Sequence, residues 1–150
     1  MAAFSAISEA RLATCHKDLQ TLFRHIIQDY DCTVVCGFRT KEEQDKAYAD
    51  GLSKVKYPGT HSTKPSIAID VAPYEKTGID WTPKQSAHFA GFVMGQAARL
   101  YRMGVMKHRI RSGADWNGDN DIDDTTFWDA CHFELILSDE EKKALVYHEK

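Results

Sequence analysis

The sequence contains no hydrophobic run that approaches the roughly 20 apolar residues of a membrane span. Its first five residues also lack the basic start and the long apolar stretch of a secretory signal. Positive charge is not in excess, because the formal net charge is -3, so the chain has no general attraction for nucleic acid or anionic membranes. A basic cluster at residues 107–111 fits a solvated strand edge about as well as a binding patch. We expect a protein that is made in the cytosol, without membrane insertion and without a nucleic-acid partner.

Cysteine motifs are absent as well. The four cysteines show neither zinc-finger nor CxxC spacing, which favours reduced, mostly buried thiols: Cys15, Cys32, Cys36 and Cys131. The composition that remains, 43% hydrophobic and 27% charged, is typical of a soluble globular protein. A chain of 150 residues can form one domain with a real core but not two ordinary ones. We expect a single domain over residues 1–150, as a monomer.

Apolar periodicity and capping residues predict the first two helices. Apolar side chains recur at three- and four-residue steps over residues 8–30, which indicates one amphipathic helix with His16 and His25 on its surface. The run Thr40-Lys41-Glu42-Glu43 is a capping box, so a second helix is expected to begin there. It should run to about residue 50, where Gly51 provides a left-handed stop.

Two further helices are predicted in the second half of the chain. One extends from Thr82 to Gly104, with Thr at the cap, Pro at the first helical position and Gln85 completing a capping box. Gly91 and Gly95, four residues apart within it, predict a place where another element packs closely. A short C-terminal helix should follow the capping sequence at residues 138–141.

Short runs of β-branched and apolar residues predict four strands, at residues 33–36, 67–72, 105–111 and 132–137. With helices between short strands, we expect an α+β domain with a small, mainly antiparallel sheet and flanking helices. Side chains alternate along a strand, so Asp70 shares one face with Ala68 and Ala72. A carboxylate among apolar neighbours is costly unless it is paired or bound to a metal. Asp70 is therefore a candidate functional residue.

Two distant segments together carry the residues that suit metal chemistry. His61 precedes the strand of Asp70, and Asp129 and His132 stand three apart at the start of the last strand. Two imidazoles and one carboxylate suit a catalytic zinc that keeps one position open for water, and a further carboxylate can deprotonate that water. Glu134 projects to the same strand face as His132, either to orient a ligand or contact substrate, or as an ordinary exposed Glu. Cys131 faces the other side and is assigned to the core.

At these positions the chain resembles a known family. The segments that carry the likeness are Cys36-Gly37-Phe38-Arg39-Thr40 with Gln44, His61 to Asp70, and Asp129-x-x-His132-x-Glu134. They closely resemble the zinc peptidases of the D-Ala-D-Ala carboxypeptidase group. That group includes VanX- and VanY-like enzymes and the L-alanyl-D-glutamate endolysins of phages, and hedgehog signalling domains share its fold. The resemblance covers residues 32–137, and the spacing from His61 to Asp70 is two residues longer than usual.

The resemblance implies a role for each matching residue. His61, Asp70 and His132 correspond to the zinc ligands. Asp129 corresponds to the catalytic acid/base and Arg39 to the arginine that stabilises the oxyanion. Gln44 is expected to lie behind a ligand or to contact the substrate.

The acidic loop at residues 115–124 is a second candidate metal site. Oxygen-bearing side chains occupy alternate positions, as in the first part of an EF-hand loop: Asp115, Asn117, Asp119, Asp121 and Asp123. Two features depart from that loop, because Asn120 replaces the usual Gly and Thr126 stands where a bidentate Glu closes the site. The alternative is a solvated turn without an ion. So many carboxylates repel one another without a cation, which favours Ca2+ and a regulatory effect on the nearby Asp129.

The resemblance implies a zinc peptidase that cuts peptidoglycan stem peptides, with a phage endolysin of L-alanyl-D-glutamate specificity as the first expectation. Such a lysin stays in the cytoplasm of the host bacterium until lysis and then acts on the cell wall. The alternatives are a D-Ala-D-Ala carboxypeptidase or dipeptidase, a non-catalytic metal-binding domain of the same fold, and a calcium-binding interaction protein. A non-catalytic domain has no need for a base and an oxyanion partner together, which favours the enzyme.

Overall fold

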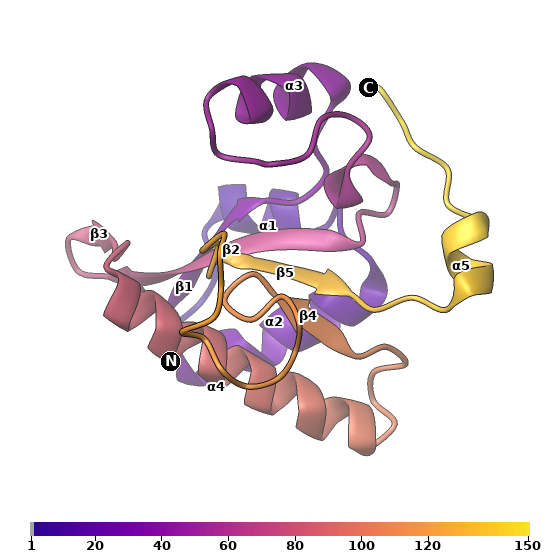
Figure 1. Ribbon diagram of the computed structural model, residues 1–150. Coiled ribbons are helices and arrows are strands. Elements are labelled where there is room, and N and C mark those ends of the chain that lie inside the picture. Colours follow the sequence, from indigo (N-terminus) through magenta and orange to yellow (C-terminus); the bar gives the residue numbers. More distant parts are fainter. Residues whose placement is uncertain (1) are drawn as a thin grey trace.

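The structure is a computed structural model and describes residues 2–150 (Figure 1). The helices are α1 (Ala6–Leu12), α2 (Lys17–Asp29), α3 (Lys41–Ala49), α4 (Pro83–Arg102) and α5 (Asp139–Lys143), with a 3-10 helix, η1, at Thr60–Ser62. The strands are β1 (Cys32–Cys36), β2 (Ala68–Glu75), β3 (Gly78–Ile79), β4 (Ile110–Ser112) and β5 (His132–Leu135). No helix within the described residues is both long and apolar enough to cross a bilayer.

The strands form one antiparallel sheet in the order β1-β2-β5-β4, and β3 pairs with the end of β2 as a small hairpin. The predicted α+β architecture with a mainly antiparallel sheet is confirmed. In the register of this sheet, Asp70 of β2 lies opposite His132 of β5 on one side and opposite Cys36 of β1 on the other. Pairing between β2 and β5 therefore unites two segments that lie 62 residues apart in sequence.

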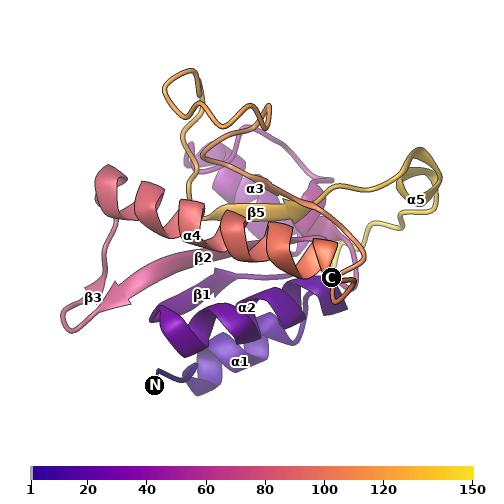
Figure 2. The same ribbon diagram turned by 90° about the horizontal axis from the view of Figure 1, so that it is seen from below.

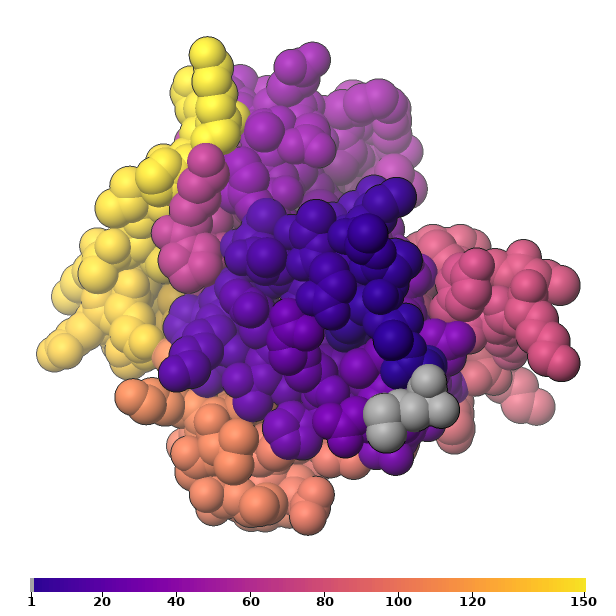
Figure 3. Space-filling view, turned by 180° about the vertical axis from the view of Figure 1, so that it is seen from behind, coloured from indigo at the N-terminus to yellow at the C-terminus, as the bar shows by residue number. Residues whose placement is uncertain are grey.

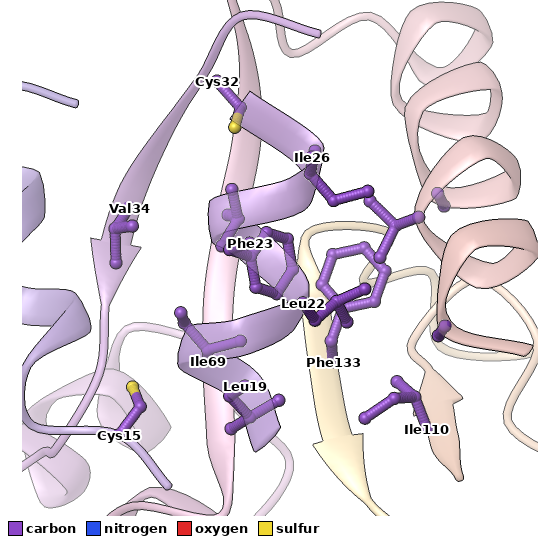
Figure 4. Packing of buried hydrophobic residues seen from close by; sticks show 14 of the residues in the cluster. Cys15, Leu19, Leu22, Phe23, Ile26, Cys32, Val34, Ile69, Ile110 and Phe133 are labelled. Carbon is purple, nitrogen blue, oxygen red and sulfur yellow. The ribbon is translucent and has the colours of Figure 1, made fainter. Parts of the chain in front are cut away.

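One face of the sheet forms the hydrophobic core, against which α2 and α4 pack (Figure 2). Ile69 of β2 and Phe133 of β5 point into this layer and meet Phe23 of α2 (Figure 4). The rings of Phe23 and Phe133 lie 5.5 Å apart, and both side chains are fully buried. Burying a side chain of this size stabilises the fold by about 1.5–3 kcal/mol. The core thus fixes β2 and β5 in place from one side.

The opposite face of the same strands carries the polar residues. Because side chains alternate along a strand, Asp70 lies between Ile69 and Val71 in sequence but projects away from the core. The segment between α3 and β2, with η1 inside it, covers this face. The predicted alternation along β2 is therefore reflected in the division between core and candidate site.

The predicted single helix over residues 8–30 is wrong, since α1 and α2 are separate helices. The chain leaves the helical path at Ala13–His16 because this stretch pairs with Ser66: His16 N donates to Ser66 O at 2.8 Å and Ser66 N donates to Thr14 O at 2.9 Å. His16 is also not a plain surface residue. Its Nδ1 accepts from Asp18 N at 3.0 Å and caps α2. The apolar periodicity continues across the break because both helices pack on one core.

The predicted strand at residues 105–111 is also too long. The amides of Lys107 and His108 donate to the carboxylate of Asp18, at 2.9 and 3.0 Å, and not to a neighbouring strand. Only Ile110–Ser112 forms β4. The strand β2 is longer than predicted, since it continues past residue 72 to Glu75. The strand β5 is shorter than predicted, since it ends at Leu135 and not at residue 137.

Two details of α4 differ from expectation. The helix begins after Thr82 without the predicted capping box, since the Thr82 hydroxyl donates to Asp80 at 2.7 Å and the Gln85 amide donates to the Tyr30 hydroxyl. No element packs closely on Gly91 or Gly95, because a methyl group at either would meet nothing within 4 Å. The capping boxes at Thr40 and Ser138 and the left-handed Gly51 are confirmed.

Candidate active site

His61 is the first member of the candidate site and lies buried in η1. Its Nδ1 donates to Gly37 O at 2.7 Å, because a carbonyl oxygen can only accept. This bond fixes the tautomer and leaves a lone pair on Nε2. That Nε2 is buried and has no hydrogen-bond partner within residues 2–150. It lies 3.4 Å from Asp70 Oδ1, so the ring points at the carboxylate with an acceptor.

His132 approaches the same oxygen from β5. Its Nδ1 lies 3.1 Å from Asp70 Oδ1, and its Nε2 lies 2.8 Å from Glu134 Oε1. When Nε2 donates to Glu134, a neutral His132 also presents a lone pair to Asp70. Two lone pairs that face the same carboxylate oxygen are stable only with protons or a cation between them and that oxygen. This donor set could hold a divalent metal ion through two imidazoles and one carboxylate.

The electrostatics of the three side chains show the same preference for positive charge. Burial opposes protonation of His61, but the Asp70 carboxylate outweighs it and raises the pKa of His61 to about 10. Burial also opposes protonation of His132, yet the bond to Asp70 raises its pKa above the ordinary value. For Asp70, burial is outweighed by His61 and His132, which hold its pKa well below the usual range. A proton or a metal ion is therefore favoured at this point.

Asp129 stands beside this trio. One oxygen of Asp129, one of Asp70 and one nitrogen of His132 all lie within 4.8 Å of one another. Burial, followed by the neighbouring charge of Asp70, raises the pKa of Asp129. Its backbone is clamped by Gly113, whose carbonyl accepts from Asp129 N at 2.9 Å. A methyl group on Gly113 would lie 2.0 Å from Asp129 O, so only glycine permits this approach.

The structure places Cys131 at the site, not in the core. Its Sγ lies 3.4 Å from Asp129 Oδ1 and the residue is half-buried. The prediction failed because β5 begins only at His132, so strand alternation does not extend back to Cys131. Burial and the nearby carboxylates raise the pKa of Cys131 strongly, which keeps it a neutral thiol. All four cysteines are free.

Arg39 and Gln44 flank Asp70 on its outer side. Arg39 Nη2 donates to Asp70 Oδ2 at 3.1 Å, and Arg39 Nη1 donates to Gln44 Oε1 at 3.1 Å. Gln44 is 2% exposed and in turn donates to Val55 O at 2.6 Å. The guanidinium carries five N–H groups, so these two bonds orient it and leave capacity for a further oxygen. The structure thus brings both predicted residues to the site.

Glu134 lies behind His132, which agrees with the interpretation that it orients a ligand. Its second carboxylate oxygen accepts from Arg111 Nη2 at 2.8 Å, which fixes both oxygens. The ring of Trp116 lies 5.3 Å from the ring of His132. Arg111, Trp116 and Gly113 also lie at the site and were not predicted from the sequence. Arg111 was visible only as part of a basic cluster, and no local signal marked the other two.

The acidic loop forms a compact turn next to the site. Oxygens of Asp115, Asp119 and Asp124 lie within 4.8 Å of one another, so Asp124 joins the cluster although it was not predicted. The side chains of Asn117, Asp119 and Asp121 accept from backbone amides two residues on, at 2.8–3.2 Å. Asn120 has φ 67° and thereby takes the left-handed conformation of the glycine that it replaces.

The fold around this site is similar to that of a solved endopeptidase. The chain is similar to the crystal structure of the L-Ala D-Glu endopeptidase ChiX of Serratia marcescens, with a TM-score of 0.67 over 89% of this chain and 90% of that chain. Sequence identity in this comparison is 22%, so the likeness shows the fold alone.

The chain belongs to the phage L-alanyl-D-glutamate peptidase family, whose sequence model matches residues 1–136. It is 33% identical over 138 residues to the L-alanyl-D-glutamate peptidase of Escherichia phage T5, covering 89% of this chain and 97% of that protein. The resemblance predicted from the sequence motifs is confirmed. The family match ends before α5, so the last part of the chain lies beyond it.

Proposed function

We propose that the chain is a zinc-dependent peptidase that hydrolyses the L-alanyl-D-glutamate bond of peptidoglycan stem peptides in the bacterial cell wall. Membership of the family and the phage T5 relative support the bond and the substrate. The main support for a metal is the buried Nε2 of His61, which has no hydrogen-bond partner in the described chain. This nitrogen faces Asp70 Oδ1, as does Nδ1 of His132. Two nitrogens and one oxygen that converge in this way suit zinc.

In this proposal each residue has one task. Zinc held by His61, Asp70 and His132 supplies a Lewis acid that activates water near neutral pH. Asp129 accepts the proton of the attacking water and passes it to the departing amine, and its raised pKa brings it closer to the working pH of a general base. Arg39 stabilises the oxyanion that forms on the peptide carbonyl.

The residues behind this set hold it in place. Glu134, fixed by Arg111, orients the imidazole of His132 as outer carboxylates commonly do for metal-bound histidines. Gln44 orients Arg39. We assign Glu134 and Gln44 these positioning roles within the proposed mechanism.

We also propose that the acidic loop binds Ca2+. Asp115 Oδ1 is buried and lacks a hydrogen-bond partner within residues 2–150, although it lies in a cluster of carboxylates. Such an atom is costly unless a cation meets it. The loop reaches the proposed zinc site through Trp116, whose Nε1 donates to Phe127 O at 2.7 Å while its ring packs on His132. Ordering of the loop by Ca2+ would therefore act on the neighbouring ligand.

Digestion of purified peptidoglycan, followed by identification of the new termini, tests the proposed specificity. New amino-terminal D-glutamate is the expected product. Released D-alanine would instead identify a D-Ala-D-Ala carboxypeptidase, and no new termini would contradict the peptidase itself. The Asp129→Ala protein provides the matched control, because it keeps the proposed zinc ligands and lacks the proposed base.

A further inference from the structure

The C-terminal segment, residues 145–150, pairs with the loop that carries His61. His148 N donates to Ser62 O at 2.8 Å, and Tyr147 forms an antiparallel bridge with Thr63. The segment runs from α5 toward α3 along the surface of the molecule (Figures 1 and 3). It therefore contacts the two residues that directly follow His61.

The same segment also reaches the start of α3. Lys41 N donates to Glu149 O at 2.8 Å, two residues after Arg39. Arg39 N itself donates to His61 O at 2.9 Å, which ties the two site residues together through their backbones. Consecutive carbonyls of the loop are thus held from two sides: that of His61 by Arg39, and that of Ser62 by the C-terminal segment.

Backbone hydrogen bonds, and little apolar burial, hold this segment. Val146 is 65% exposed and Tyr147 is 44% exposed, so these side chains add little to the core. Upstream, α5 is attached through Glu141 Oε2, 2.6 Å from His108 Nε2. The family match ends at residue 136, so the segment lies outside the matched residues. Leu145 packs against the edge of the core, whereas residues 147–149 contact the loop and α3.

Between α3 and β2, the only regular structure within the described chain is the three-residue η1. Residues 61–63 are buried, and Ser66 pairs with Thr14 and His16 at the end of the loop. The carbonyl of Ser62, directly after the proposed ligand, is bonded to the C-terminal segment. Such a neighbouring bond matters for a zinc ligand, because the support of a ligand determines metal affinity.

We propose that residues 145–150 are a positioning element of the active site, which fixes His61 for metal binding and Arg39 for turnover through their backbone bonds to Ser62 and Lys41. This inference rests on the proposed function, since it assigns the segment to the zinc site. The segment makes no contact with substrate in this role.

The experiment compares three full-length variants. His148→Pro removes the amide that donates to Ser62 O, whereas His148→Ala keeps that amide and removes only the imidazole. Val146→Pro introduces proline in the same segment just past the end of α5, where proline is well tolerated and no amide hydrogen bond is lost within the described structure. For each variant, Zn2+ affinity is measured by competition with a chelating dye, and kcat and KM are measured separately on wall fragments.

His148→Pro is expected to bind Zn2+ about 10-fold more weakly, as for the loss of other outer supports of a metal site. Its kcat should fall while KM changes little, and amide exchange at residues 61–63 of the metal-free protein should accelerate. His148→Ala and Val146→Pro should match the wild type. In the metal-free state, all three should share the wild-type unfolding midpoint, because residues 146–148 add little to the core.

Equal Zn2+ affinity and equal exchange rates in His148→Pro and the wild type would overturn the inference alone. A wild type that binds no Zn2+ would overturn the proposed function and this inference with it. A second variant, Lys41→Pro, tests the other contact, since proline is favoured at the first position of a helix. It loses the amide to Glu149 together with the exposed Lys41–Asp45 ion pair, and Lys41→Ala, which loses only the side-chain contacts, is its control. Lys41→Pro should lower kcat with Zn2+ affinity retained, and an unchanged kcat would remove Arg39 from the proposal.

Discussion

The two candidate metal sites of this protein are built in opposite ways. At the first site, His61, Asp70 and His132 come from separate elements and are 4%, 8% and 7% exposed. At the second site, the acidic residues come from one loop and are largely exposed. At the first site, Asp70 and His132 are held by the sheet and its core, and His61 is held by bonds from other segments to its loop. The second site is held by hydrogen bonds between its own side chains and its own backbone.

This difference predicts different responses to loss of the ion. A site formed by strand pairing keeps its geometry without a metal, because the core fixes β2 and β5 from behind. A site confined to a loop has no such support, and its ionised carboxylates repel one another when no cation is bound. Removal of zinc should therefore abolish chemistry with little change of fold, and removal of calcium should change the shape of a loop.

The largest effect is expected from the residues of the buried site. Asp129→Ala should reduce turnover by at least about 100-fold, the usual contribution of a positioned general base, while zinc content survives. His132→Ala should lose both zinc and activity. Wall-digestion rates and metal content of the purified variants measure the two outcomes. Full activity of Asp129→Ala would show that another group is the base.

A smaller effect is expected on the stability of the zinc-free protein as pH rises. The folded pKa of His61, about 10, lies above its unfolded value of 6.5. Protonated His61 therefore stabilises the fold fully below about pH 6.5, and this contribution is lost as pH rises toward 10. Between pH 7 and 9 the chelated protein should lose about 1 kcal/mol per pH unit.

The zinc-loaded protein should show no such loss, because bound zinc replaces the proton on His61. Urea unfolding at each pH, with and without a zinc chelator, gives the comparison. The pH range stops at 9 because buried Cys15 and Cys32, with pKa values raised from 9.0 to about 12 by burial, contribute strongly above it, and below it they affect both forms equally. If the free energy of unfolding depended on pH equally in the zinc-loaded and the zinc-free protein, the assignment of His61 as a zinc ligand would be contradicted.

The smallest effect is expected from the acidic loop. A calcium-selective chelator that leaves zinc bound should lower activity by about 5-fold, the lower end of typical coupling between sites. Asp119→Asn should weaken the response to added Ca2+ and leave zinc content unchanged. Unchanged activity after calcium removal would refute the coupling through Trp116, and a zinc content that falls with calcium would show that the two sites are not separate.

Local signals predicted the parts of the fold and site that local chemistry controls. Alternation along β2 placed Asp70 away from Ile69, and the capping boxes at Thr40 and Ser138 set two helix starts. The break between α1 and α2 was missed because it depends on pairing with Ser66, about fifty residues away. A continuous apolar stripe cannot report such a distant partner.

In the candidate site, too, local motifs could be predicted and contacts between distant residues could not. The motifs carried His61, Asp70, Asp129 and His132, which the structure brings together. Gly113 could not be found in this way, since its role is to let one backbone approach another. Arg111 was hidden for a related reason, because its partner Glu134 becomes a neighbour only when β4 and β5 pair.

The alternation of β2 limits how this chain can evolve. Ile69 and Asp70 serve opposite layers, so one residue inserted into the strand would turn a carboxylate toward Phe23 and an isoleucine toward His61. A single insertion would therefore damage both the stability of the core and the chemistry of the site. We expect changes of length to be tolerated in the connections between elements and not within β2.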